Sequence, residues 1–305
     1  MDLSTRTRPP LLAGLVAALL AISPLSGCSA HTAESAASAT RTPVPSTPGA
    51  LPRPDHVLLV IFENKAYQQV IGSESAPFLT SLAQAGANFT NAHGEQHPSQ
   101  PNYIAQLAGS THGVDDDSCP QNLGNQPNLA RQLLDNGDTF GGYSEDQPGV
   151  GFTGCTSSDG RYARKHNPWV DFANIPAGAN LPLSALPVDF AALPTVAVVV
   201  PNMCNDMHDC PVASGDSWAG QHLSSYRDWA RTHNSLLIVT FDEDNGTAAN
   251  HIPTVFLGPM VGPGDVAGYI DHYAILRTLE DMYQLTPIGD AATTPPITGI
   301  WTSAR

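Results

Sequence analysis

Four short apolar runs dominate the chain beyond residue 50. Each is rich in Val, Ile and Leu and shows little alternation between apolar and polar positions, which is typical of strands buried on both faces of a parallel sheet. They are HVLLVIF (56–62), TVAVVV (195–200), SLLIVTF (235–241) and IPTVFLG (252–258). The stretch TFGGY (139–143) is a weaker candidate for a further strand.

Helical patterns separate these runs. Their apolar residues recur at helical spacing, and several segments end on glycine, a frequent residue at helix C-termini. The segments are APFLTSLAQAG (76–86), NYIAQLAG (102–109), NLARQLLDNG (128–137) and AILRTLEDMYQL (274–285). Because strands alternate with helices, we predict an α/β fold, a three-layer α/β/α sandwich with a mostly parallel central sheet.

The first 27 residues have the organisation of an export signal. Arg6 and Arg8 give a basic start, and the apolar run LLAGLVAALLAI that follows is shorter than the ~20 residues a membrane-spanning helix needs. LSGC, which ends at Cys28, resembles the bacterial lipobox, in which the leader is cut before a cysteine whose thiol carries a lipid. We predict a lipoprotein signal peptide over residues 1–27. The exported protein is then anchored through Cys28 to the outer face of the bacterial cell membrane, or is secreted; the alternative is an ordinary secretory signal with an unrelated cysteine.

The segment 28–54 differs in composition from the rest of the chain. Ser, Thr, Ala and Pro dominate it, and little in it can form a core, so we interpret it as a flexible tether. Residues 55–305 are numerous enough for one large domain. We expect this domain to carry the function.

The charge of the chain excludes one class of partner. The formal net charge is −15, and removing the leader with Asp2, Arg6 and Arg8 leaves −16. Such a surface repels nucleic acid, and the sequence contains no basic stripe. The acidic balance suits an exported, soluble domain and does not identify a ligand.

Four cysteines remain beyond Cys28. An even number in an exported chain indicates two disulfides, for which three pairings exist. We favour Cys204–Cys210, which are close in sequence, together with Cys119–Cys155. The segment CNDMHDC offers a Cys/His metal site as the alternative, but the chain has no CxxC motif and an oxidising compartment favours disulfides.

Polar side chains follow the predicted strands at the points where the strands end. In an open α/β sheet, ligands bind at the carboxyl ends of the strands, so residues distant in sequence are delivered to one edge. These residues are Glu63 and Asn64, Ser144 and Glu145, Asn202, Asp206 and His208, and Asp242 and Glu243. We therefore expect the functional site at this edge.

Four of these residues are suited to holding a divalent cation. Glu63, Asn64, Asp242 and Glu243 offer hard oxygen donors, and carboxylates gathered without a cation would repel one another and raise their pKa. Oxygen ligands favour Mg²⁺, Ca²⁺ or Mn²⁺, and an added histidine would admit Zn²⁺ or iron.

Ser99 occupies a corner between a loop and a helix in HPSQPNYIAQL. Pro101 fits the first helical turn, and on this segment alone an N-cap is the favoured role for the serine. Beside a metal and a helix N-terminus, however, the hydroxyl can ionise and act as a nucleophile. The two roles can coexist.

Six spaced motifs give a more specific indication. The motifs are IFENKAY, HPSQPNYIAQLAGST, KHNPWVDF, VPNMCNDMHDC, TFDEDNG and NHIPTVFLGP. Together they resemble the phosphoesterase family, and they occur in the order expected for it between about residues 55 and 285. That family contains bacterial acid phosphatases and phospholipases C and belongs to the alkaline phosphatase superfamily. The resemblance implies an α/β/α sandwich and a metal-assisted hydrolase of phosphate esters.

The resemblance also implies roles for individual residues. The metal ligands would be Glu63, Asn64, Asp242 and Glu243, joined by Ser99 as the attacking group. Because an asparagine and a glutamate occupy ligand places, one divalent metal ion is expected rather than two. The residues expected to bind phosphate oxygens or protonate the leaving group are His166, His208 and His251. Asp206 is expected either to orient His208 or to bind a second cation, and His97 is expected to support the site residues.

These roles define a first hypothesis and two rivals. The first is an acid phosphatase-like phosphomonoesterase that forms a phosphoserine on Ser99 and acts on small phosphate esters. The second is a phospholipase C-type phosphodiesterase, although the chain is short for that group and has no obvious apolar insertion. The third is a lipoprotein that binds a metal or an anion without turnover, for which Ser99 would have no use.

Overall fold

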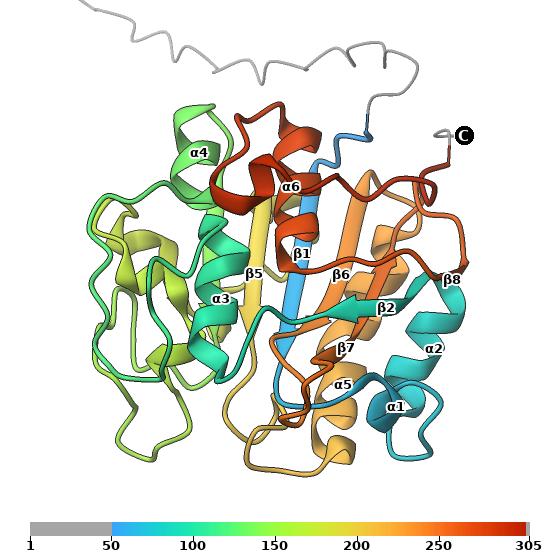
Figure 1. Ribbon diagram of the computed structural model, residues 1–305, viewed down its shortest axis with the longest axis horizontal. Coiled ribbons are helices and arrows are strands. Elements are labelled where there is room, and N and C mark those ends of the chain that lie inside the picture. The colour runs from blue at the N-terminus through green and yellow to red at the C-terminus, as the bar shows by residue number, and fades with distance from the viewer. Residues whose placement is uncertain (1–50, 303–305) are drawn as a thin grey trace, which may run out of the picture. The chain divides into compact units, whose positions relative to one another are not determined.

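An eight-stranded sheet lies at the centre of the computed structural model, which describes residues 51–302 (Figure 1). The strand order is β4-β3-β5-β1-β6-β7-β2-β8, and β7 is the one strand of this sheet that runs antiparallel to its neighbours. The strands are β1 (His56–Phe62), β2 (Ala87–His93), β3 (Phe140–Ser144), β4 (Asn180–Pro182), β5 (Val196–Val200), β6 (Ser235–Phe241), β7 (His251–Leu257) and β8 (Gly264–Val266). The predicted mostly parallel sheet is confirmed.

Helices cover both faces of this sheet, which completes the predicted three-layer α/β/α arrangement. In Figure 1, α3 and α6 lie in front of the strands and α5 lies behind them. One face carries α1 (Tyr67–Val70), α2 (Pro77–Ala85) and α5 (Val212–Ala230); the other carries α3 (Ser99–Ala108), α4 (Leu129–Asp135) and α6 (His272–Tyr283). Short 3₁₀ turns are η1 (Arg164–His166), η2 (Pro168–Asp171), η3 (Ala177–Ala179), η4 (Leu183–Ala185), η5 (Phe190–Ala192) and η6 (Gly289–Ala292).

The apolar runs form the innermost strands, where almost all of their side chains are buried. In β1, β5 and β6 nearly every residue is buried, as both faces of these strands pack against helices. Phe62 and Phe241 stack at a centroid distance of 5.4 Å, and Trp218 of α5 meets Phe62 edge-on at 5.9 Å. The site described below therefore lies at the ends of strands that are tightly packed on both faces.

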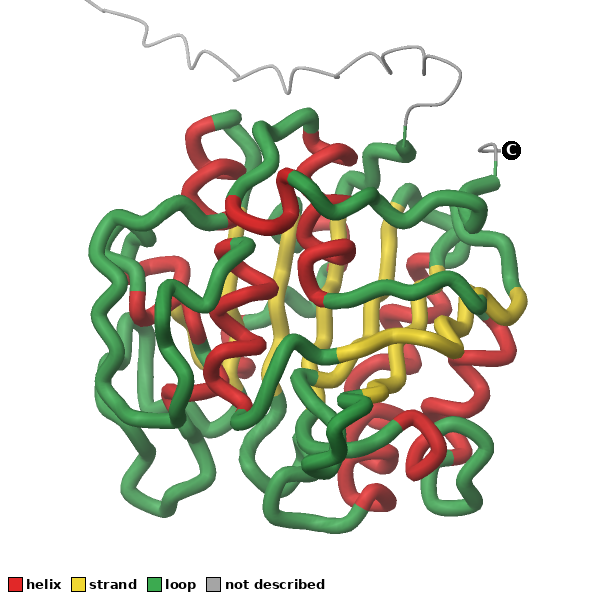
Figure 2. The backbone as a smooth tube through the Cα atoms, viewed as in Figure 1, coloured by secondary structure: helices red, strands yellow, loops and turns green. Residues whose placement is uncertain are grey.

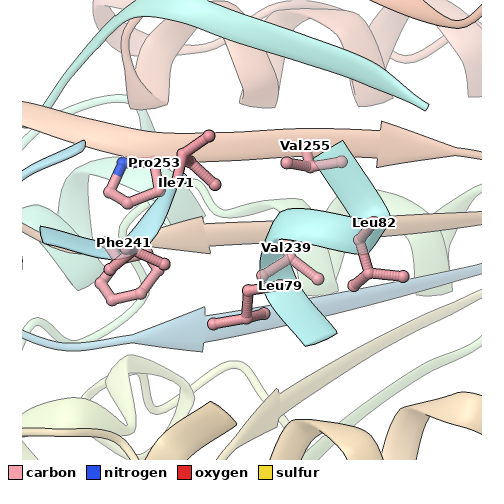
Figure 3. A pocket seen from close by; sticks show the side chains of 8 residues that line it. Ile71, Leu79, Leu82, Val239, Phe241, Pro253 and Val255 are labelled. Atoms are coloured by element: carbon pink, nitrogen blue, oxygen red, sulfur yellow. The ribbon is translucent and has the colours of Figure 1, made fainter. Parts of the chain in front are cut away.

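The packing between α2 and the sheet is close to complete. Ile71, Leu79 and Leu82 face Val239 and Val255 of β6 and β7 (Figure 3). The void enclosed here, which Val70, Phe241 and Pro253 also line, measures about 10 Å³, roughly the space of one water. Its lining is apolar, so it is a packing gap rather than a ligand site.

Some elements were not predicted from the sequence. Strand β2 reads ANFTNAH and carries polar residues, and its pairing with β7 is interrupted by an irregularity between Phe89 and Ala92. Helix α5 reads VASGDSWAGQHLSSYRDWA, in which small and polar residues dilute the helical signal. The run at 252–258 is a strand as predicted, but it returns antiparallel beside β6.

Both predicted disulfides are present. Cys119 pairs with Cys155 and Cys204 pairs with Cys210, so the alternative of a Cys/His metal site is wrong. The shorter bridge closes the loop between β5 and α5. That loop carries two of the predicted site residues, Asp206 and His208.

The predicted signal peptide, Cys28 and most of the tether lie outside the described residues and stay predictions. Among residues 51–302, none of the helices is both long and apolar enough to cross a membrane.

A buried carboxyl group on α6 should make stability depend on pH. Glu280 is fully buried and its Oε1 accepts a hydrogen bond from the Ile288 N–H at 3.0 Å. Burial raises the pKa of Glu280 from 4.5 to about 7. The unfolded chain therefore releases this proton at lower pH than the folded protein, so stability from this group is lost as pH rises from about 4.5 to about 7. We expect urea unfolding of Glu280→Gln to show a smaller loss of unfolding free energy over this range. Equal losses in the two proteins would contradict the assignment.

Candidate active site

The carboxyl ends of β1, β5 and β6 meet at one edge of the sheet, where loops dominate the chain trace (Figure 2). The segments after these strands supply Glu63, Asp206 and Asp242. Ser99 reaches the same place from the first turn of α3, and His166 from η1. The edge predicted from the strand ends is thus the place where these residues gather.

Ser99 lies between two carboxylates. Its Oγ donates toward Glu63 Oε2 at 3.0 Å and toward Glu243 Oε1 at 3.0 Å, and the side chain is buried. The interpretation of Ser99 as the N-cap of its helix is wrong, because Pro98 occupies the cap position and no side-chain cap hydrogen bond forms. The hydroxyl is directed at the acidic cluster instead.

A buried histidine joins two acidic residues behind this cluster. His166 Nε2 lies 2.9 Å from Glu63 Oε1, and His166 Nδ1 lies 3.2 Å from Asp206 Oδ2. Tyr103 of α3 stacks on the imidazole at a centroid distance of 5.2 Å. Burial lowers the pKa of His166, but the Glu63 charge and the hydrogen bond with Asp206 outweigh burial and raise it to about 9. Burial in turn raises the pKa of Glu63, yet the charge of His166 brings it to about 2.

The negative charges of the two carboxylates after β6, Asp242 and Glu243, are less well offset by nearby positive charge. Burial raises the pKa of Asp242 well above its ordinary value, and the charges of Glu63 and Glu243 raise it further. Burial also raises the pKa of Glu243, although hydrogen bonds from His97 and Ser99 offset part of this effect. His97 Nδ1 contacts Glu243 Oε2 directly, and His97 Nε2 lies 3.0 Å from the Thr247 carbonyl oxygen.

These residues fit a divalent cation. Glu63, Asp242 and Glu243 each offer an oxygen within 4.8 Å of the others, and Glu63 forms a second such group with His166 and His208. Asp242 Oδ2 is buried and has no hydrogen-bond donor among the described residues. A buried oxygen left in this state is costly. A cation bound to it would relieve both the missing bond and the mutual repulsion of the carboxylates.

Two further residues that were predicted to belong to the site, Asn64 and His251, make contacts other than those described so far. Asn64 has a left-handed backbone (φ 55°), and its N–H donates to Asp242 Oδ1 at 3.1 Å. His251 lies at the start of β7, stacked on Tyr67 at 4.9 Å, with Nε2 3.1 Å from the Thr90 carbonyl oxygen. The contacts of His251 therefore join it to the β2 and β7 side of the site rather than to Ser99.

One positively charged residue near the site was not predicted from the sequence. Lys165 Nζ forms an ion pair with Asp117 Oδ2 at 2.7 Å and lies 3.3 Å from His208 Nε2. Burial lowers the pKa of Lys165, but the hydrogen bond to Asp117 outweighs this effect and raises it, so the ammonium stays charged. His208 Nδ1 faces Asp209 Oδ1 at 2.7 Å, and its side chain is 26% exposed. The only available signal for Lys165 was its place in KHNP, directly before His166.

The chain is similar to known phosphatases. It is 50% identical over 254 residues to the phosphatidylinositol-3-phosphatase of Mycobacterium tuberculosis, covering 83% of this chain and 84% of that protein. It is 30% identical to the probable acid phosphatase of Kluyveromyces lactis and to the phosphate-repressible acid phosphatase of Penicillium chrysogenum, covering 84% and 77% of this chain. This chain spans 64% and 60% of the lengths of those two fungal relatives.

The protein is thus a hydrolase that acts on phosphate esters. It belongs to the Phosphoesterase family, whose model matches residues 73–286. The resemblance to this family is confirmed, and the matched residues contain five of the six motifs; IFENKAY precedes them.

Solved structures agree on the fold. A protein of the alkaline phosphatase superfamily from Vibrio parahaemolyticus matches with a TM-score of 0.57 at 13% identity, covering 81% of this chain and 71% of that one. The phosphonate monoester hydrolase of Agrobacterium radiobacter matches with a TM-score of 0.51 at 14% identity, covering 77% and 74%. The sandwich is therefore of the alkaline phosphatase type.

Binding of a divalent cation should stabilise this protein through Asp242. After EDTA treatment, adding Mg²⁺, Ca²⁺, Mn²⁺ or Zn²⁺ in turn should raise Tm for at least one of them, because a bound ion at about 100 times its Kd adds ~2.7 kcal/mol to the free energy of unfolding. Asp242→Asn should lose most of this gain because it removes a charged ligand oxygen. Differential scanning fluorimetry measures both. Asp135→Asn, whose side chain is 68% exposed on α4, is the control; a full gain in Asp242→Asn would contradict the site.

Proposed function

We propose that the protein is a metal-dependent phosphomonoesterase in which Ser99 is the nucleophile. The observation that carries the proposal is the position of the Ser99 Oγ, 3.0 Å from carboxylate oxygens of both Glu63 and Glu243. A hydroxyl held among acceptors, at the first turn of a helix, has both a route for its proton and a favourable dipole for negative charge. A protein that only bound a metal would need the carboxylates but not this hydroxyl.

The cation would be held by Glu63, Asp242 and Glu243, with Asn64 directly after Glu63 in the chain. When bound, it supplies positive charge that lowers the pKa of the serine hydroxyl and stabilises charge on phosphate oxygens. His166 is 1% exposed, so it acts through Glu63 as a positioning residue. It fixes the Glu63 carboxylate and contributes a positive charge behind it.

The first step transfers the phosphoryl group to the enzyme. Ser99 Oγ attacks phosphorus in line, its proton passes to Glu243, and the bond between phosphorus and the ester oxygen breaks. His208, which is partly exposed beside Lys165, gives its proton to the leaving oxygen, and an alcohol departs. The product on the enzyme is phosphoserine.

The second step restores the enzyme. Water attacks phosphorus and passes a proton to His208, the Oγ–phosphorus bond breaks, and Ser99 takes back its proton from Glu243. Inorganic phosphate leaves. Lys165 stays charged throughout and stabilises negative charge on the non-bridging oxygens in both transition states.

The substrate class follows from the charges and from the relatives. A monoester dianion carries more negative charge than a diester, and Lys165, His208 and the cation favour the more charged group. The mycobacterial relative is named for phosphatidylinositol 3-phosphate, so we propose that this chain also removes a phosphate group from the headgroup of an inositol lipid, besides small monoesters. The proposed lipid anchor at Cys28 would hold the domain near such a membrane surface.

Loss of the serine hydroxyl should abolish turnover. We expect Ser99→Ala to lower kcat for p-nitrophenyl phosphate by at least about 10³-fold, and EDTA to do the same to wild type. The control is Ser81→Ala, which removes a hydroxyl bonded to the Phe78 carbonyl on α2 and should keep full activity. Phosphate release from phosphatidylinositol 3-phosphate vesicles is measured in parallel. Turnover of p-nitrophenyl phosphorylcholine alone would establish the phospholipase C alternative, and retained activity in Ser99→Ala would exclude the serine as nucleophile.

Removal of the Lys165 charge should weaken the stabilisation of negative charge on the phosphate group. We expect Lys165→Met to lower kcat/KM for p-nitrophenyl phosphate about 10–100-fold, since one charged partner of the transition state is lost. Arg131→Met is the control, because Arg131 pairs with Asp135 on the surface of α4. Unchanged kcat/KM in Lys165→Met would place this lysine outside the phosphate site.

A further inference from the structure

The loop that leads into Ser99 is held by side chains that the proposed mechanism does not use. Residues 94–98 connect β2 to α3 and carry His97. A loop of this kind has no regular hydrogen-bond ladder, so its backbone groups need other partners. Two buried asparagines, Asn102 and Asn250, supply them and are called the asparagine pair below.

Asn102 bonds to this loop from the helix that Ser99 begins. It lies in the first turns of α3 and is fully buried. Its Oδ1 accepts from the N–H groups of Glu95 at 2.8 Å and Gln96 at 3.0 Å. Its Nδ2 donates to the carbonyl oxygens of Gln96 at 2.7 Å and Pro98 at 3.2 Å. One side chain therefore uses both ends of its amide to fix the turn immediately before the serine.

Asn250 reaches the same loop from the opposite side. It directly precedes β7, and its left-handed backbone (φ 44°) is a conformation that asparagine tolerates better than most residues. Its Oδ1 accepts from the Asp244 N–H at 2.7 Å, and its backbone carbonyl accepts from the Gly94 N–H at 2.9 Å. Its Nδ2 donates to the Gln96 carbonyl oxygen at 3.2 Å.

The asparagine pair meets at one atom. The Gln96 carbonyl oxygen accepts from both Asn102 and Asn250. Gly94 permits the close approach, since a Cβ at this position would lie 2.6 Å from the Asp242 carbonyl oxygen and 2.7 Å from Asn250 Nδ2. The chain of contacts thus runs from α3 through the loop to the segment that carries Asp242 and Glu243.

We propose that Asn102 and Asn250 are positioning residues that set the distance between the Ser99 hydroxyl and the carboxylates after β6. The inference rests on the proposed function of that site. Nucleophile and acidic residues come from segments more than 140 positions apart, and the asparagine pair is a direct polar connection between them. A misplacement of about 1 Å can cost ~10²-fold in rate even when the chemical groups are intact.

The role predicts a split between kinetic constants. The groups that we assign to phosphate binding, Lys165 and His208, lie on other segments, so substrate binding should persist when the pair is broken. We expect Asn102→Ala and Asn250→Gly to lower kcat for p-nitrophenyl phosphate about 10–100-fold while KM stays within about twofold. The glycine variant keeps the left-handed backbone available, so it removes the side chain without adding strain.

A matched control separates positioning from general stability. Asn128 is fully buried, caps α4 through the Arg131 N–H at 2.8 Å, and donates to Gln126 O at 3.0 Å and Asn174 Oδ1 at 2.8 Å. Asn128→Ala should lower Tm comparably and leave kcat unchanged. The double variant Asn102→Ala/Asn250→Gly should lose less than the product of the two single losses, because both residues act on one carbonyl group.

The outcomes are distinct. A fall in kcat at constant KM, absent from Asn128→Ala, supports the inference. Unchanged kcat with lowered Tm, or a change confined to KM, overturns it. If Asn102→Ala does not fold, Asn250→Gly decides alone. Ser99→Ala is run in the same series: if it stays active, the proposed nucleophile is wrong, and this result is distinguishable from failure of the asparagine pair.

Discussion

The repulsion among carboxylates brought to one edge of the sheet is the constraint around which the site is organised. Glu63, Asp206, Asp242 and Glu243 are all buried, and each in isolation would favour its neutral form. One imidazolium, that of His166, lies between Glu63 and Asp206 and offsets their negative charge. Among residues 51–302, the pair after β6, Asp242 and Glu243, has no comparable buried cation, and this asymmetry supports the proposal of a metal ion there.

The fold places these buried charges at the ends of well-packed, hydrogen-bonded strands. The strands that Glu63 and Asp242 directly follow pair in register along their whole length, from His56 with Ser235 to Phe62 with Phe241. The two acidic residues are therefore fixed by backbone hydrogen bonds before any side-chain contact is made. Ser99 is different, because it comes from a loop and helix on one face, and its position depends on polar side chains.

Much of the architecture was predictable because it depends on local patterns. The runs at 56–62 and 235–241 coincide with β1 and β6, and the acidic residues after them could be placed by topology alone. Helix α5 and strand β2 escaped prediction because tertiary packing, rather than intrinsic pattern, selects their structure. The role of Ser99 could not be decided from its segment, since an N-cap and a nucleophile have the same local sequence. The carboxylates that the Ser99 hydroxyl contacts, which support the second role, lie 36 and 144 positions away.

The disulfide between Cys204 and Cys210 has a consequence for when the site is completed. It closes a loop that contains Asp206, the partner of His166, and His208. A newly made chain in a reducing compartment would keep this segment free, and ordering it would cost conformational entropy that the closed loop has already lost. Formation of the disulfide therefore lowers the entropic cost of ordering Asp206 and His208, so the oxidised chain holds these two residues in place more readily than the reduced chain.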